Sequence, residues 1–345
     1  MKRNRTLRIA VTATLSLLLL IGGLGQTQTI EAADTKVAAI FGIGGLGDQS
    51  YNDLVYEGLE RAKEDLGVDF DYAEPKEVTD FEVIMRDMSD SGEYDTIICI
   101  AFDQLDALSK VAPDYPDQQY ALIDASLEMD NVASYSSKEH EGAFIVGALA
   151  ALMKQDGENY GLENNHNYGF VGAMENDTIF KFASGYQAGV KYVDEEADVQ
   201  IQYVGGDNPF GDTTTAKEIA TSQYSKGCDI IFHAAGGAGL GVFSAAKEND
   251  FVAIGTNSNQ NLLDPDHIVA SMLKRADTAA YDVVKCTVDV ELGLGSEKKL
   301  GLSDEGIDYT LEGSNIKVSD EIVNQLEEIR TKIIDGEIEI PTTLE

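Results

Sequence analysis

Residues 36–58 read KVAAIFGIGGLGDQSYNDLVYEG, and this stretch decides the fold. An apolar run at its start leads through a glycine-rich turn into a segment of helical length. Open α/β sheets place their ligands at such strand-to-helix turns. The turn has the G-x-G-x-x-G spacing of a dinucleotide-binding site, at Gly42, Gly44 and Gly47. The residues that follow, DQSYN at 48–52, suggest a different chemistry.

The alternation of short apolar runs and amphipathic segments continues along the whole chain, which predicts parallel sheets covered on both faces. We expect strands at 37–43, 68–72, 96–101, 120–124, 132–135, 168–171, 201–204, 229–233, 251–255 and 268–271, and an extended segment at 307–311. We expect helices at 50–66, 80–88, 103–111, 139–153, 179–193, 214–224, 242–248, 276–291 and 319–334. The pattern restarts near Asn165, which predicts two similar lobes with a cleft between them. Ser319 is placed to cap the last helix.

Composition excludes several classes of protein. The 345 residues carry a formal charge of −36, which disfavours nucleic acid and anionic membranes as partners. We interpret the negative charge as a feature that keeps the protein soluble, as in a saline habitat. The three cysteines share no metal-binding spacing, and the four histidines include no H-x-x-x-H pair. The sequence therefore predicts neither a metal site nor a cofactor.

Residues 1–33 have the layout of a secretory signal. Four basic residues precede the apolar run Ile9–Leu24, and the segment ends in Ala32-Ala33. An uncleaved anchor is the alternative, because the run is close to the lower length limit for a membrane span. No cysteine follows the run as a lipid-attachment site. We therefore expect a protein secreted across the plasma membrane, either periplasmic or associated with the cell surface.

A nicotinamide-dependent oxidoreductase is the first reading of the glycine turn. Asp69 or Asp71 stands near the position of the acidic residue that binds ribose in such sites. Against this reading, Asp48 places a carboxylate where the pyrophosphate would meet the helix. Export removes the protein from cytoplasmic nicotinamide, and no proton-transfer pair for hydride chemistry stands out. The oxidoreductase is kept as an alternative.

The residues after the turn suit a planar ligand better. Asp48 or Ser50 can cap the helix that begins there. Tyr51 offers an aromatic face, and Asp48 and Asn52 offer hydrogen-bonding groups beside it. Capping and ligand binding are compatible at this position.

The segment GGLGDQSYND resembles the GG-x-x-D-x-S-F-N motif of the PnrA-like (basic membrane protein) substrate-binding proteins of ABC transporters. Further blocks follow in the family's order and extend the resemblance over residues 36–340. They read YALIDA, NVASYSSKEHEGAFIVGALAALM, GFVGAM, KFASGYQAG, YVGGDNPFGD, GCDIIFHAAGGAGLGV, AIGTNSNQ and SMLKRAD.

The resemblance implies a type I periplasmic-binding-protein fold, with two Rossmann-like lobes joined by a hinge. We place lobe 1 at residues 34–136 plus about 257–293, and lobe 2 at 137–256 plus about 294–345. The implied function is non-enzymatic capture of a purine nucleoside, such as adenosine, guanosine or inosine, for an ABC permease. The receptor is expected to be a monomer.

The resemblance also assigns ligand-binding roles. The base would stack between Tyr51 (usually Phe in the family) and Phe210, and Asp124 would accept hydrogen bonds from its edge. Gly237 would let the backbone approach ribose, because a side chain there would block it. Lys274 would reach a ribose hydroxyl. The remaining members of the first-lobe wall would be Asp48, Ser50 and Asn52.

Two features depart from the family pattern. The usual aspartate that grips ribose is Asn257 here, within the stretch IGTNSNQ at 254–260. An amide lacks the charge that strengthens a bond from a hydroxyl, so we expect altered ribose contact. This change keeps another planar solute, such as riboflavin or a free nucleobase, as an alternative ligand. The second departure is the missing lipid-anchor cysteine.

Overall fold

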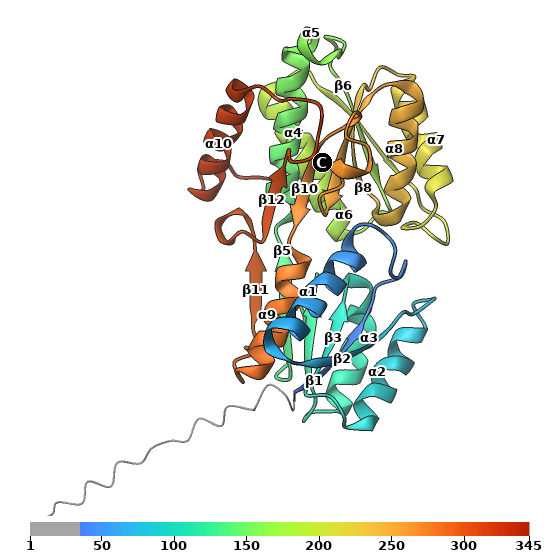
Figure 1. Ribbon diagram of the computed structural model, residues 1–345, viewed down its shortest axis with the longest axis vertical. Helices are drawn as coiled ribbons and strands as arrows, with labels where there is room; N and C mark the ends of the chain where they lie inside the picture. Colours follow the sequence, from blue (N-terminus) through green and yellow to red (C-terminus); the bar gives the residue numbers. More distant parts are fainter. Residues whose placement is uncertain (1–34, 345) are drawn as a thin grey trace, which may run out of the picture.

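A computed structural model describes residues 35–344 of the chain, and the predicted secretory signal lies outside that range. The described residues form two lobes, each built on a six-stranded sheet with helices on both faces (Figure 1). The predicted α/β class with parallel-dominated sheets in two lobes is confirmed. Between residues 35 and 344, no helix combines the length and the apolar character that crossing a bilayer requires.

Lobe 1 contains a fully parallel sheet of order β11-β5-β4-β3-β1-β2. Its strands are β1 (Lys36–Ile40), β2 (Asp69–Ala73), β3 (Thr96–Ile100), β4 (Gln119–Ile123), β5 (Val132–Ser137) and β11 (Glu297–Leu300). Its helices are α1 (Tyr51–Leu66), α2 (Asp80–Ser91), α3 (Leu105–Val111) and α9 (Ala276–Val288). Side chains alternate between the two faces of a strand, so Val37 and Ala39 pack with α1 and α9, whereas Ala38 and Ile40 pack with α2 and α3.

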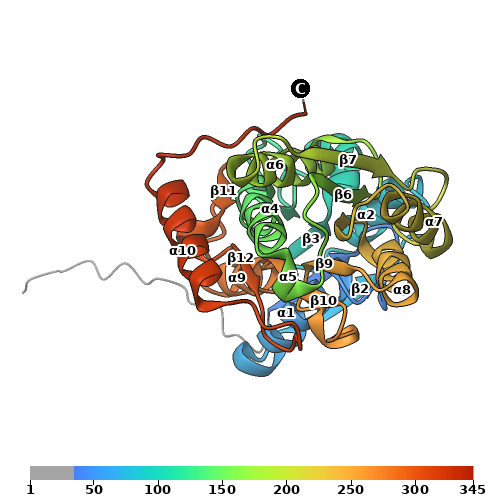
Figure 2. The same ribbon diagram turned by 90° about the horizontal axis from the view of Figure 1, so that it is seen from above.

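Lobe 2 repeats this plan with the order β12-β10-β9-β8-β6-β7, in which only β12 runs antiparallel. Its strands are β6 (Asn167–Gly172), β7 (Asp198–Tyr203), β8 (Ile230–Ala234), β9 (Val252–Asn257), β10 (Ile268–Lys274) and β12 (Ile307–Thr310). Its helices are α4 (Glu139–Gln155), α5 (Gly157–Tyr160), α6 (Asp177–Val193), α7 (Thr213–Tyr224), α8 (Leu240–Asn249) and α10 (Asp320–Ile334). Helix α10 lies along α4 on the outside of the lobe (Figures 1 and 2).

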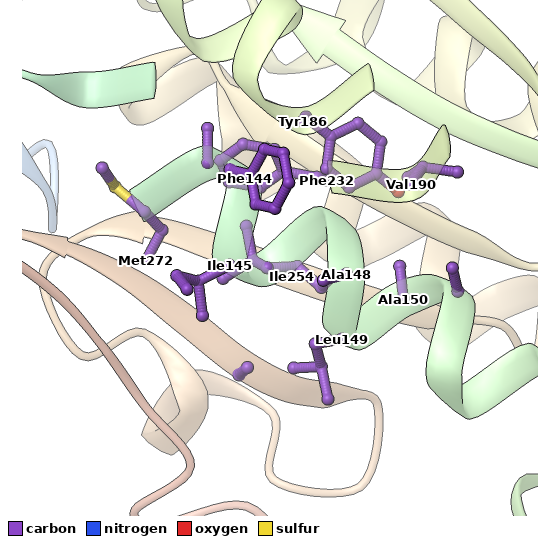
Figure 3. Packing of buried hydrophobic residues seen from close by; sticks show 14 of the residues in the cluster. Phe144, Ile145, Ala148, Leu149, Ala150, Tyr186, Val190, Phe232, Ile254 and Met272 are labelled. Carbon is purple, nitrogen blue, oxygen red and sulfur yellow. The ribbon is translucent and has the colours of Figure 1, made fainter. Parts of the chain in front are cut away.

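Helix α4 is the centre of the lobe 2 core, and every residue from Gly142 to Lys154 is buried. Figure 3 shows its apolar side chains beside Tyr186, Val190 and Phe232. Gly147 of α4 lies against the backbone of α6. A Cβ at Gly147 would lie 2.3 Å from the Tyr186 carbonyl oxygen, and one at Gly189 only 2.0 Å from the Phe144 carbonyl oxygen. The two helices therefore touch backbone to backbone.

The chain passes between the lobes three times, after β5, after β10 and after β11. This corrects the predicted lobe boundaries in two places. Strand β10 belongs to the lobe 2 sheet, so the return to lobe 1 comes at residue 275 and not near 257. Strand β11, which the sequence pattern did not predict, pairs with β5 in lobe 1, so residues 294–300 do not belong to lobe 2.

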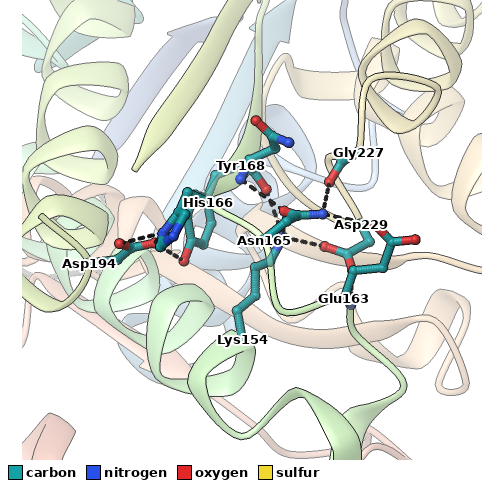
Figure 4. A network of polar contacts seen from close by, with 9 residues as sticks. Lys154, Glu163, Asn165, His166, Tyr168, Asp194, Gly227 and Asp229 are labelled. Carbon is teal, nitrogen blue, oxygen red and sulfur yellow. Dashed lines mark hydrogen bonds and ion pairs between the residues drawn. The ribbon is translucent and has the colours of Figure 1, made fainter. Parts of the chain in front are cut away.

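A buried lysine, Lys154, holds the starts of two lobe 2 strands together in the polar network of Figure 4. Lys154 Nζ donates to Asp229 Oδ1 at 2.6 Å, to Asn165 Oδ1 at 2.6 Å and to the Asn167 carbonyl at 2.9 Å. The three acceptors use all three ammonium protons, so the buried charge is satisfied. The group joins α4 to the starts of β6 and β8, and we interpret it as structural.

Candidate functional site

A cavity of about 320 Å³ lies between the lobes, at the carboxyl ends of both sheets. This is where open α/β sheets bind ligands, and the volume suits one small solute. Most of the residues predicted for the site line this cavity, namely Asp48, Tyr51, Asn52, Asp124, Phe210, Gly237, Asn257 and Lys274. Ser50 does not line this cavity and instead lines a neighbouring groove.

The glycine-rich turn forms part of the lobe 1 wall, but several of its backbone N–H groups are already bonded to protein side chains. Gly42 N donates to Asn52 Oδ1 at 3.1 Å, Leu46 N to Glu74 Oε2 at 2.9 Å and Gly47 N to Asp53 Oδ1 at 2.7 Å. A phosphate cradle needs such donors free and faces no carboxylates. The turn is therefore built as a closed loop and not as a dinucleotide cradle.

Asp48 is the cap of α1. Its carboxylate accepts from the backbone N–H groups of Ser50, Asn52 and Asp53 at 2.9, 2.9 and 3.2 Å, and from Asn52 Nδ2 at 3.2 Å. The Ser50 side chain does not cap the helix. Burial nevertheless raises the pKa of Asp48, because desolvation outweighs these donors. The sequence offered Asp48 or Ser50 as the cap, and the structure selects Asp48.

Aromatic rings approach the cavity from both lobes. Tyr51 begins α1 in lobe 1, and its buried hydroxyl has no hydrogen-bond partner among the described residues. Burial raises the pKa of that hydroxyl. Phe210 comes from lobe 2 and is held by a hydrogen bond of 2.7 Å from Ala238 N to its carbonyl. Its ring lies 6.2 Å from that of Phe102 in lobe 1, so the aromatic pair bridges the lobes.

A chain of buried charges runs from lobe 1 to lobe 2 at one end of the cavity. Lys274, at the end of β10, donates to Asp124 at the end of β4, and at 2.9 Å to Glu139 Oε1 at the start of α4. Lys181 Nζ lies 3.3 Å from Glu139 Oε2. Burial raises the pKa of Asp124 to about 6 against the opposing effect of Lys274. Lys274 and Asp124, predicted to hold different parts of the ligand, are thus bonded to each other.

Asn257 contributes to lobe closure. Its Nδ2 donates to Ser50 Oγ of lobe 1 at 2.9 Å. The Gln49 carbonyl accepts from Ser258 Oγ at 3.0 Å and from Gln260 Nε2 at 3.1 Å. Both Gln49 and Asn257 have positive φ, a conformation that residues other than glycine seldom adopt. The loop 257–260 therefore ties lobe 2 directly to lobe 1 at the rim of the cavity.

Gly237 also lies where the lobes meet. A Cβ there would stand 3.3 Å from the Phe210 carbonyl oxygen and 3.6 Å from Asp48 Cα, which belongs to the opposite lobe. The absent side chain thus leaves room for lobe 1 as well as for a ligand. Two other glycines of the same segment serve packing, because Gly239 lies on the His233 ring and Gly241 on the Thr213 carbonyl.

Phe102 and Asp103 are among the cavity residues that the sequence reasoning missed. Phe102 and Asp103 follow β3 and line the cavity beside Tyr51. Their only sequence signal is position, since both come directly after a buried parallel strand, where ligand-contacting side chains gather. Within residues 35–344, His, Cys, Asp and Glu side chains form no group of three or more that is suited to a metal ion.

Comparisons with known proteins agree with this geometry. A family model described as ABC transporter substrate-binding protein PnrA-like matches residues 35–343. An ABC transporter nucleoside-binding protein, BmpA of Lactococcus lactis, is 28% identical, and the match covers 99% of each chain. An uncharacterized lipoprotein of Pyrococcus abyssi is 33% identical over 84% of this chain and 72% of its own length. The crystal structure of an ABC transporter solute-binding protein from Aeropyrum pernix superposes with a TM-score of 0.81 at 31% identity, covering 90% of this chain and 94% of that one.

Proposed function

The chain belongs to the PnrA-like family of ABC transporter substrate-binding proteins, and from that premise we propose that it captures a purine nucleoside between its lobes and delivers it to a membrane permease. A protein of this family binds a solute for transport and is not an enzyme. The oxidoreductase alternative is set aside, and the engaged N–H groups of the glycine turn agree with that.

The observation that carries the proposal is the presence of one aromatic residue from each lobe, Tyr51 and Phe210, in the lining of one cavity. They come from opposite lobes and both line a space of about 320 Å³. A flat base between two such rings gains stacking and loses contact with water. Asp124, at one end of the same space, supplies an acceptor for the base edge. The nucleoside-binding name of the Lactococcus lactis relative supports the same ligand class.

Binding follows from closure of the lobes around the solute. An open form would take up the ligand on one lobe, and rotation about the chain crossings would bring the second ring onto it. The rim contacts from Ser258 and Gln260 to Gln49 would form in the same step. We place this activity outside the plasma membrane, because residues 1–33 have the layout of an export signal.

One observation favours a second ligand class. Asn257 was expected to contact ribose, yet its amide donates to Ser50. A solute without ribose, such as a free nucleobase or riboflavin, would leave that bond undisturbed. Thermal-shift measurements with adenosine, guanosine, inosine, the free bases and riboflavin separate the two classes, since a bound ligand raises Tm. Stabilisation by the bases but not by their nucleosides would overturn the nucleoside proposal.

The stacking residues provide the direct test. We expect Tyr51→Ala and Phe210→Ala each to weaken nucleoside binding by about 1–3 kcal/mol, roughly 5- to 150-fold in Kd, because each removes one face of the stack. Calorimetric titration measures the loss. Tyr192→Ala is the matched control, since Tyr192 is 46% exposed on α6 and does not line the cavity. Unchanged affinity in both cavity variants would refute the site.

A further inference from the structure

Asp103 is a cavity residue that the family motifs do not include. It lies in the short turn Phe102–Gln104 directly after β3. Its Oδ1 is buried without a hydrogen-bond partner among the described residues. Its Oδ2 accepts only a long bond of 3.4 Å from Ile43 N. An ionised carboxylate has about four acceptor positions, so most of the capacity of Asp103 is unused.

Asp103 and Asp124 both follow inner strands of the lobe 1 sheet, at the carboxyl ends of those strands. Strands β3 and β4 are parallel neighbours, and Ile100 pairs with Ile123. The residues that follow these two strands therefore emerge side by side. Burial raises the pKa of Asp103 to about 6, and the charge of Asp124 adds to that effect. The two residues line the same cavity, and their carboxyl groups interact electrostatically.

The positive charge nearest to this pair is already engaged. Lys274 donates to Asp124 Oδ1 and to Glu139 Oε1. Lys274 uses only Oδ1 of Asp124. This end of the cavity therefore presents hydrogen-bond acceptors, which attract N–H groups of a ligand and repel its lone pairs.

Purine bases differ in what they offer to such acceptors. Guanine presents a ring N–H and an amino group side by side, whereas hypoxanthine has only the ring N–H on that edge. Adenine presents an amino group next to an acceptor nitrogen, which a carboxylate repels. We propose, resting on the function proposed above, that Asp103 is a specificity-determining residue that acts with Asp124 to select guanosine over inosine and adenosine.

Calorimetric titration of the full chain with guanosine, inosine and adenosine tests this proposal. We expect guanosine to bind most tightly. Asp103→Asn, which replaces a carboxylate oxygen by an N–H donor, should weaken guanosine binding roughly 10- to 100-fold and inosine binding much less. Asp106→Asn is the matched control, because Asp106 lies nearby on α3 with its side chain 79% exposed. It should leave all three affinities unchanged.

The outcomes separate the two proposals. If no nucleoside binds to the unaltered protein, both the function and this inference fail. If inosine binds as tightly as guanosine, the inference alone fails, whether or not the Asp103 variant folds. Equal weakening of guanosine and inosine in Asp103→Asn also overturns it, because Asp103 would then only hold the glycine turn through Ile43 N. A collapse of the guanosine-to-inosine ratio is the supporting result.

Discussion

His233, a fully buried residue at the end of β8, connects the lobe 2 core to the rim of the cavity. Its Nε2 lies 3.1 Å from Gln260 Oε1, which also accepts from Thr256 N at 2.8 Å. The amide of Gln260 then reaches the Gln49 carbonyl in lobe 1. Burial lowers the pKa of His233 to about 4. The imidazole is therefore neutral throughout the physiological range and donates its Nε2–H to Gln260.

The lowered pKa of His233 predicts loss of stability in acid. The unfolded chain takes up this proton near pH 6.5, whereas the folded protein does so only near pH 4, so stability present above pH 6.5 is lost as the pH falls toward 4. Between pH 7 and 4.5 the loss due to His233 is about 2–3 kcal/mol. The unaltered protein and His233→Gln are unfolded in urea at pH 7 and at pH 4.5. The difference between their free energies of unfolding should change by this amount between the two pH values. Parallel pH profiles would contradict the prediction.

The site could be predicted from sequence where a local motif carries it. Tyr51 and Asn52 stand beside the glycine turn, and a strand-to-helix turn fixes where they lie. The bond between Lys274 and Asp124 could not be predicted, because 150 residues separate the partners and only the hinge brings them together. Asp103 was missed for a related reason. A single carboxylate after a strand is not recognisable as a site residue until the neighbouring strand in the sheet is known.

Helices α4 and α6 show how small residues set the spacing of a core. Three glycines lie where the two backbones meet, with Gly147 of α4 against Tyr186, and Gly185 and Gly189 of α6 against His140 and Phe144. Glycine weakens an isolated helix by about 1 kcal/mol relative to alanine. Packing must stabilise the protein by more than this cost. The close approach of the two helices provides it, because apolar side chains of both helices pack together around the crossing (Figure 3).

Gly189→Ala is therefore expected to destabilise the protein despite alanine's better helix propensity. The new Cβ would lie 2.0 Å from the Phe144 carbonyl oxygen, so the helices must separate. We expect a loss of about 1–3 kcal/mol in the free energy of unfolding, which chemical denaturation measures. Gln187→Ala, at a half-buried position on the same helix, is the control and should change stability little. A gain in stability for Gly189→Ala would show that the crossing is loose.

Most elements could be predicted from the sequence because their periodicity is strong. Ser319 accepts from Ile322 N at 3.4 Å, as the capping pattern of α10 predicted. The exceptions are the short helix α5 and strand β11, whose residues Glu297, Lys298 and Lys299 are exposed. An edge strand with polar side chains shows no apolar alternation, so only its pairing with β5 defines it. The lobe boundaries were wrong for the same reason, since sheet membership depends on distant partners.

The whole molecule carries many more acidic than basic side chains, 61 against 25. The ion pairs at its surface involve only part of this excess, and exposed pairs stabilise by less than about 1 kcal/mol each. The folded state therefore contains repulsion between carboxylates that ion pairs do not offset. Dissolved ions reduce such repulsion, and the Debye length falls from about 10 Å at 0.1 M to about 3 Å at 1 M salt.

Salt is accordingly expected to stabilise the protein. Tm at pH 7.5 should rise by several degrees as NaCl increases from 0.05 to 0.5 M, because screening relieves repulsion that is stronger in the compact state. The same series at pH 5, where part of the carboxylates are protonated, is the control and should give a smaller rise. A Tm that falls with salt at pH 7.5 would show that attractive ion pairs outweigh the repulsion.

The three passages between the lobes also govern the order in which the protein can mature. Lobe 1 needs α9 to cover one face of its sheet and β11 to complete the edge, and both are synthesised after the whole lobe 2 segment from α4 to β10. Lobe 2 in turn needs β12 and α10, which come last. Lobe 1 therefore cannot complete its sheet until lobe 2 has been made from α4 to β10, and a chain that ends before about residue 300 holds two incomplete sheets. Each sheet is completed only by a strand from the last fifth of the chain, β11 in lobe 1 and β12 in lobe 2.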